Sequence, residues 1–158
     1  MIELVQVRAQ ENQVDLRWHA AETMPDLVFD PEGIHRAVLN VVTNAIDAVS
    51  EGEQGGWVEV AALYLPGRRL VQIEVRDSGP GIPPDQMEKL FSPFVSTKKG
   101  RGTGLGLPVS QKILTEHGGR ILVESQPGHG ASFTLELPAV MPTSATATQI
   151  QDTPGTES

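Results

Sequence analysis

The chain has 158 residues, 39% of them hydrophobic and 20% charged, as expected for one folded domain with its own core. Its net charge of −8 argues against nucleic-acid binding, and no apolar run approaches the roughly 20 residues of a membrane span. The absence of cysteine excludes disulfides and thiolate metal sites, so we expect a cytoplasmic domain without direct membrane contact.

The N-terminal part predicts a helix, a strand and a second helix. Residues 1–12 lack a capping residue at their start, so we expect them to be the end of a helix truncated from a longer protein. Alternation over 14–18 predicts a half-buried strand, with which 27–29 could pair. Asp30 and Pro31 are typical of an N-cap and a first helical position, and apolar residues at helical spacing continue to about 49.

The rest of the chain predicts strands at 57–65 and 70–76, a short helix at 84–90 and a loop at 92–104. A helix at 105–116, stopped by Gly118-Gly119, and strands at 120–125 and 132–137 follow. Residues 13–140 therefore form one domain, and 141–158 a disordered tail rich in Thr, Ser, Pro and Gln. Without strict βαβ alternation, the order predicts a two-layer α/β sandwich, a mixed sheet packed on about three helices.

A polar stripe lies on the long predicted helix. Asn40, Asn44 and Asp47 share one face by their spacing of four and three residues. Such a stripe is often a solvated surface, but amide oxygens are also suitable ligands for a hard cation such as Mg²⁺.

Asp77-Ser78-Gly79-Pro80-Gly81-Ile82 directly follows a predicted strand. The two glycines allow a carboxylate and bare backbone to approach a flat ligand closely, and a carboxylate accepts a hydrogen bond from an adenine amine. By itself the pattern is also typical of an ordinary turn.

A glycine-rich segment with Gly102, Gly104 and Gly106 comes just before a predicted helix. Its backbone N–H groups and the helix N-terminus form a suitable anion site, although such a segment can also be a flexible linker. The spacing differs from a dinucleotide fingerprint, and no P-loop motif is present.

In this order, four segments resemble the nucleotide-binding boxes shared by DNA gyrase, a major heat-shock chaperone, mismatch-repair MutL proteins and histidine kinases. They are L-N-V-V-T-N-A-I-D-A at 39–48, D-S-G-P-G-I at 77–82, L-F-S-P-F-V-S-T-K at 90–98 and G-T-G-L-G-L at 102–107. Residues 117–138 also resemble the end of a histidine kinase, and the N-A-I-D-A version is similar to nitrogen-regulation-type kinases. The resemblance covers about residues 1–138 and implies a Bergerat-type ATP-binding fold over 13–140.

The resemblance implies roles for individual residues toward ATP and Mg²⁺. Asn44 would ligand Mg²⁺, and Asn40 would support the metal directly or through water. Asp77 would read the adenine amine, in a base pocket shaped by Gly79, Gly81 and Ile82.

The resemblance also implies a lid over about 92–102, with Phe91 and Phe94 anchoring its base. Lys98 would contact the terminal phosphate, and backbone N–H groups would bind phosphates at Gly102, Thr103, Gly104, Leu105 and Gly106. Asp47 belongs to the expected nucleotide-binding residues, but many histidine kinases have lysine there, which gives Lys98, Lys99 and Arg101 more weight here. Ala131 stands where relatives often have threonine.

We therefore expect a protein-histidine kinase domain, with Asn40 and Lys98 as catalytic residues, that donates the γ-phosphate of ATP to a histidine. Asn40 stands where ATPases and anti-sigma-type serine kinases place a glutamate that acts as a general base, and an amide cannot take a proton. The four histidines, at 19, 35, 117 and 129, have no phosphoacceptor context and are expected to be structural or exposed. The expected partners are a histidine-containing dimerisation domain and a response regulator; the alternatives are a degenerate nucleotide-binding module or a serine kinase.

Overall fold

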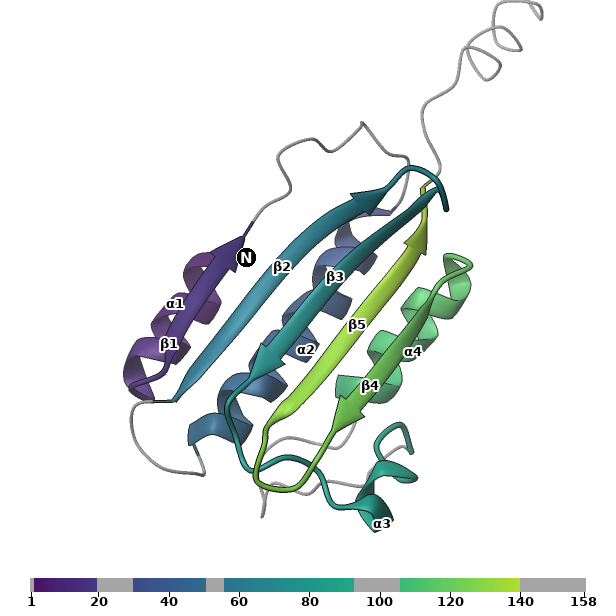
Figure 1. Ribbon diagram of the computed structural model, residues 1–158. Helices are drawn as coiled ribbons and strands as arrows, with labels where there is room; N and C mark the ends of the chain where they lie inside the picture. The colour runs from purple at the N-terminus through teal and green to yellow at the C-terminus, as the bar shows by residue number, and fades with distance from the viewer. Residues whose placement is uncertain (1, 20–29, 51–55, 93–105, 140–158) are drawn as a thin grey trace, which may run out of the picture.

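Five strands form one mixed sheet in the order β1-β2-β3-β5-β4 in the computed structural model, which describes residues 2–19, 30–50, 56–92 and 106–139. β1 pairs with β2 in parallel, and the other neighbours are antiparallel (Figure 1). The strands are β1 (Asp15–His19), β2 (Trp57–Leu65), β3 (Leu70–Asp77), β4 (Arg120–Ser125) and β5 (Ala131–Pro138).

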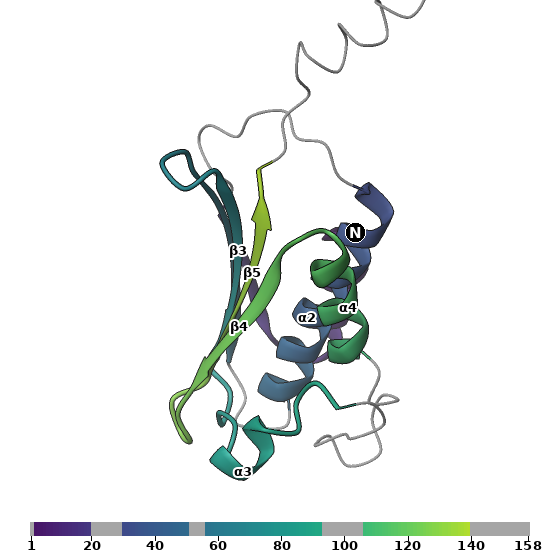
Figure 2. The ribbon, with the colours of Figure 1, turned by 90° about the vertical axis from the view of Figure 1, so that its right-hand side faces the viewer.

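Three helices pack on one face of this sheet: α1 (Ile2–Glu11), α2 (Pro31–Ser50) and α4 (Gly106–Glu116). The short helix α3 (Pro84–Met87) lies beyond the ends of β3 and β4 (Figure 2). Among the described elements none covers the opposite face of the sheet. The predicted two-layer α/β sandwich with about three helices is confirmed, and no helix of the described ranges is long and apolar enough to cross a membrane.

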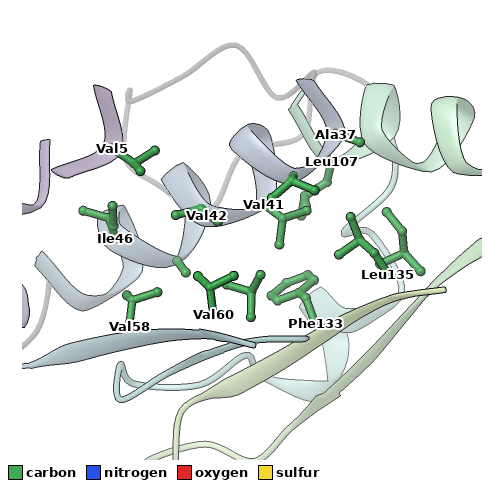
Figure 3. Close-up of a cluster of buried hydrophobic side chains, with 14 of the residues drawn as sticks. Val5, Ala37, Val41, Val42, Ile46, Val58, Val60, Leu107, Phe133 and Leu135 are labelled. Carbon is green, nitrogen blue, oxygen red and sulfur yellow. The ribbon is translucent and has the colours of Figure 1, made fainter. Parts of the chain in front are cut away.

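The core lies between α2 and the sheet (Figure 3). One face of α2 is fully buried, because its apolar residues recur at helical spacing, and small and β-branched side chains let the helix approach the strands closely. β2, β3 and β5 contribute every second residue to this layer, as a sheet with one buried face requires. The central members are Val41, Val42, Ala45, Ile46, Val58, Val75, Phe133 and Leu135.

Helix α1 is held on α2 by apolar packing and by one ion pair. Val5 and Ala9 are buried. Between them, the Arg8 guanidinium donates to both carboxylate oxygens of Asp47 at 2.7–3.0 Å. The Asp47 side chain is 6% exposed and that of Arg8 44% exposed. The carboxylate of Asp47 is thus desolvated and held by a bidentate partner.

Some predicted boundaries differ from the structure. The short helix predicted at 84–90 ends at Met87, because the next amides bond three residues back: Lys89 to Gln86 and Leu90 to Met87. The other predicted helices and strands appear within one or two residues of their expected bounds. The strand expected at 27–29, most of the loop expected at 92–104 and the tail at 141–158 lie outside the described residues.

We predict that Arg8→Ala lowers the free energy of unfolding by about 2 kcal/mol, because it leaves a buried carboxylate without its bidentate partner. Urea denaturation followed by circular dichroism measures the change. Arg17→Ala is the matched control: Arg17 pairs with Asp15 on the exposed edge strand, and we expect a loss below about 1 kcal/mol. Equal losses in the two variants would contradict the anchoring role of Arg8.

Candidate functional site

One face of α2 contacts both glycine-containing segments that the sequence singles out. The side-chain amide of Asn40 donates to the Gly106 carbonyl at 3.2 Å. Two turns further along, a methyl group added at Gly79 would lie 3.3 Å from the backbone carbonyl of Ala48. Residues 40, 44 and 48 recur every four positions, so Asn44 lies between these two contacts, which are about 12 Å apart along the helix axis.

The acidic member of the site, Asp77, is the last residue of β3 and is 5% exposed. Burial raises the pKa of its carboxyl group from 3.8 to about 6, while hydrogen bonds from the N–H groups of Gly79 and Ala131 act in the opposite direction. The Gly79 amide donates to Oδ1 at 2.9 Å. The structure therefore holds a desolvated carboxylate at one end of the α2 face, oriented by backbone donors.

The loop after Asp77 is fixed on both sides. Ser78 binds the start of β2, where its hydroxyl accepts from the Trp57 amide at 2.8 Å. On the other side, the Ile82 amide donates to Oγ of Ser125 at 2.8 Å. The side chain of Ile82 packs against the core. The predicted base-pocket residues Gly79, Gly81 and Ile82 thus belong to one ordered loop.

At the opposite end of the α2 face, Gly106 begins α4, an 11-residue helix whose positive end lies beside Asn40. Helix α4 is locked onto α2 by the buried Ser110 hydroxyl, which donates to the Ala37 carbonyl at 2.9 Å. Phe91, at the expected base of the lid, packs against the core. The other predicted lid and phosphate residues lie outside the described residues: Phe94, Lys98, Lys99, Arg101, Gly102, Thr103, Gly104 and Leu105.

Asp47, expected to bind nucleotide, is the Arg8 partner described above, so one contact of its carboxylate is with α1. A nucleotide contact by Asp47 stays a prediction. The histidines have structural or exposed positions: His19 bonds to Glu59 at 3.0 Å, and His35 and His129 are exposed. His117 joins two helix ends, since Nδ1 bonds to the Ile113 carbonyl and Nε2 accepts from the Asp30 amide.

Sequence reasoning missed the turn between β4 and β5 as part of this site. Ser125 and Gly130 contact the loop after Asp77, but they are more than 40 residues away in the chain. An open depression beside this turn is bordered by Trp57, Arg76 and Ser132 from the outward face of the sheet, and Asp77 and Ser125 line its inner edge. We do not assign a nucleotide to it, because Asn40 and Asn44 lie on the helical layer.

A two-layer sandwich whose central helix carries two asparagines between two glycine segments, beside a buried aspartate, defines the class of Bergerat-type ATP-binding domains. Comparison with family models agrees: residues 29–141 match the model described as histidine kinase-, DNA gyrase B- and HSP90-like ATPase. The chain belongs to this family. Its relatives identify it as a histidine kinase ATPase domain of the kind found in two-component sensor kinases. The family resemblance inferred from the nucleotide-binding boxes is confirmed.

Two curated relatives illustrate the likeness. The sensor histidine kinase ZraS of Salmonella typhimurium is 43% identical over 139 residues, which are 88% of this chain and 29% of the relative. The sensory histidine kinase/phosphatase NtrB of Vibrio alginolyticus is 38% identical over 143 residues, 86% of this chain and 40% of the relative. The chain therefore spans well under half the length of these relatives.

Solved structures show the same fold. The nucleotide-free catalytic domain of histidine kinase ThkA superposes with a TM-score of 0.71 at 32% identity, over 87% of each chain. Full-length ShkA, solved in complex with AMPPNP, gives a TM-score of 0.77 at 30% identity, over 90% of this chain and 29% of that one.

Titration of Asp77 predicts a pH-dependent stability. Because its pKa is raised to about 6, the folded protein retains a proton that the unfolded chain has already released, and stability falls as the pH rises from about 4 to about 6. The full effect is about 3 kcal/mol. Asp77→Asn removes this titrating group, so the stability difference between wild type and variant should change over that interval.

Urea denaturation of both proteins at pH 4, 5, 6 and 7.5 measures the difference between their free energies of unfolding. The contributions of the other carboxylates cancel in this difference. A wild-type-minus-variant difference that stays constant from pH 4 to 7.5 would show that Asp77 titrates normally.

Proposed function

We propose that this domain binds ATP together with Mg²⁺ and donates the γ-phosphate to a histidine on a separate dimerisation domain. The observation that carries the proposal is the face of α2 that runs from Gly106 past Asn44 to Gly79. It places an amide between an anion-binding helix N-terminus and a buried carboxylate. The length of this α2 face, from Gly106 to Gly79, is comparable with the distance from the base to the terminal phosphate of an extended nucleotide.

The base end of the site suits adenine. A carboxylate at position 77 accepts a hydrogen bond from the exocyclic amine, and the glycine at 79 lets the loop lie against the backbone of α2 and present bare backbone to a flat ring. With a pKa of about 6, Asp77 is ionised at neutral pH and provides this acceptor. Guanine has a carbonyl in place of that amine, so the same carboxylate discriminates against it.

The metal end depends on amide oxygens. Among the described residues no three acidic or histidine side chains gather into a metal site, so Asn44 and the phosphates of the nucleotide are the donors that we assign to Mg²⁺. The amide nitrogen of Asn40 is held on Gly106, and its oxygen is the atom that would face the metal or a metal-bound water. Mg²⁺, when bound, neutralises charge on the phosphates during transfer.

The kind of phosphate acceptor is inferred from the absence of a general base at position 40. An ATPase or serine kinase needs a general base for water or a hydroxyl, and Asn40 cannot take a proton. A neutral imidazole is already a nucleophile, so a histidine acceptor needs least help from this domain. Lys98 is proposed as the second catalytic residue, on the terminal phosphate. A response regulator would then receive the phosphate from the histidine.

We expect the wild-type chain to bind a fluorescent ATP analogue more tightly with Mg²⁺ than with EDTA. Asn44→Ala should remove this Mg²⁺-dependent gain, and Asp77→Ala should weaken binding at least tenfold under both conditions, as loss of a buried charged hydrogen bond implies. Fluorescence titration measures both, with circular dichroism to verify folding. Metal-independent binding by the wild type would favour a degenerate nucleotide-binding module instead.

Phosphoryl transfer should require a second component. Incubated alone with γ-labelled ATP, the chain is expected to gain no acid-labile label, because its histidines occupy structural or exposed positions without a phosphoacceptor context. Addition of a histidine-containing dimerisation domain from a sensor kinase of this family should produce label on that domain. Label on the chain itself, mapped to a histidine or serine by mass spectrometry, would refute transfer in trans.

A further inference from the structure

The turn between β4 and β5, residues 126–130, packs against the loop that follows Asp77. The Gly128 amide donates to the Pro80 carbonyl at 2.6 Å. The backbone is so close that a Cβ at Gly81 would collide with the Gln126 carbonyl, and one at Gly130 with the Asp77 carbonyl. Both glycines also have positive φ, of 81° and 78°. The two segments are therefore in direct backbone contact at these glycines.

One side chain joins this contact from the inward face of the sheet. The Ser125 hydroxyl accepts from the Ile82 amide at 2.8 Å and donates to the Gly130 carbonyl at 2.9 Å. Both hydrogen-bonding functions of this partly buried hydroxyl are thus used, one toward the predicted base-pocket loop and one within its own hairpin. A hydroxyl, of serine or threonine, supplies a good donor and a good acceptor from one atom, whereas alanine supplies neither.

We propose that Ser125 is a positioning residue for the adenine pocket. It acts through Ile82, not by contact with the nucleotide, and the inference rests on the proposed function. Without the hydroxyl, the Ile82 amide loses its partner, and the loop that carries Gly79 and Gly81 is held on the hairpin only by the Gly128–Pro80 hydrogen bond and the backbone packing. The pocket is then less ordered before the base enters, and ordering it lowers the affinity.

The test compares Ser125→Ala with wild type in calorimetric titrations with Mg·ATP and with metal-free ADP. We expect both Kd values to rise by the same factor, on the order of tenfold, because the base pocket is common to the two ligands. Hydrogen exchange of the Ile82 amide, measured by NMR on the ligand-free protein, should accelerate in the same variant. A role in stability alone would leave both Kd values unchanged in the folded protein.

Three variants serve as controls. Ser125→Thr keeps the hydroxyl and should retain wild-type affinity. Ser125→Val has the same shape as the threonine variant but no hydroxyl, and it should behave like the alanine variant. The threonine and valine variants replace Ser125→Ala in the test if the alanine variant does not fold. Ser132→Ala removes a hydroxyl that bonds to Glu74 on the outward face of the sheet and should change neither readout.

Wild-type Kd values in Ser125→Ala, or equal affinity of the threonine and valine variants, would overturn this inference alone. Failure of the wild type to bind ATP would overturn the proposed function, and the inference with it. Unchanged exchange at Ile82 in Ser125→Ala would overturn the hydrogen-bonded link itself, whatever the nucleotide data.

Discussion

The packing of α2 on the sheet is the constraint on which the site depends. Its apolar face is buried to completion at Val41, Val42, Ala45 and Ile46, so the helix has a fixed rotation about its axis. That rotation determines where the opposite, polar face points. The hydrogen bonds from Ser110 to Ala37 and from Asn40 to Gly106 then lock α4 against the same helix. The direction in which Asn44 leaves the helix is thus decided by the apolar side chains buried on the other side of α2.

Small residues make the close approaches possible. Alanine at position 48 and glycine at 79 let a strand-end loop lie directly on the helix backbone. The loop is otherwise fixed by hydrogen bonds to β2 and to β4, the latter made by its Ile82 amide. A site built this way can present bare backbone and one carboxylate to a flat ligand, and its shape comes from the surrounding secondary structure.

Local patterns in the sequence predicted most of the elements, because helical and strand periodicity are properties of neighbouring residues. The candidate site residues Asn40, Asp77 and Gly106 were recognised from short motifs of a few residues each. The residues that contact Asp47 and Ile82 could not be predicted in this way. Arg8 is 39 residues from Asp47, and Ser125 is 43 residues from Ile82. Which residues meet over such separations depends on helix packing and strand register. The spacing along α2 predicts only that Asp47 lies on the same helix face as Asn40 and Asn44.

The buried aspartate shows how the fold and the ligand are related energetically. Burial disfavours the charged form of Asp77, yet the N–H groups of Gly79 and Ala131 keep its pKa near 6, so that the group is still ionised at neutral pH. Two backbone donors thus compensate only part of the lost hydration. An adenine amine would add a third donor in the same water-poor place, where a hydrogen bond to a charged group is strong. On the proposed function, the incomplete solvation of this carboxylate in the free protein would therefore be a source of affinity for the base.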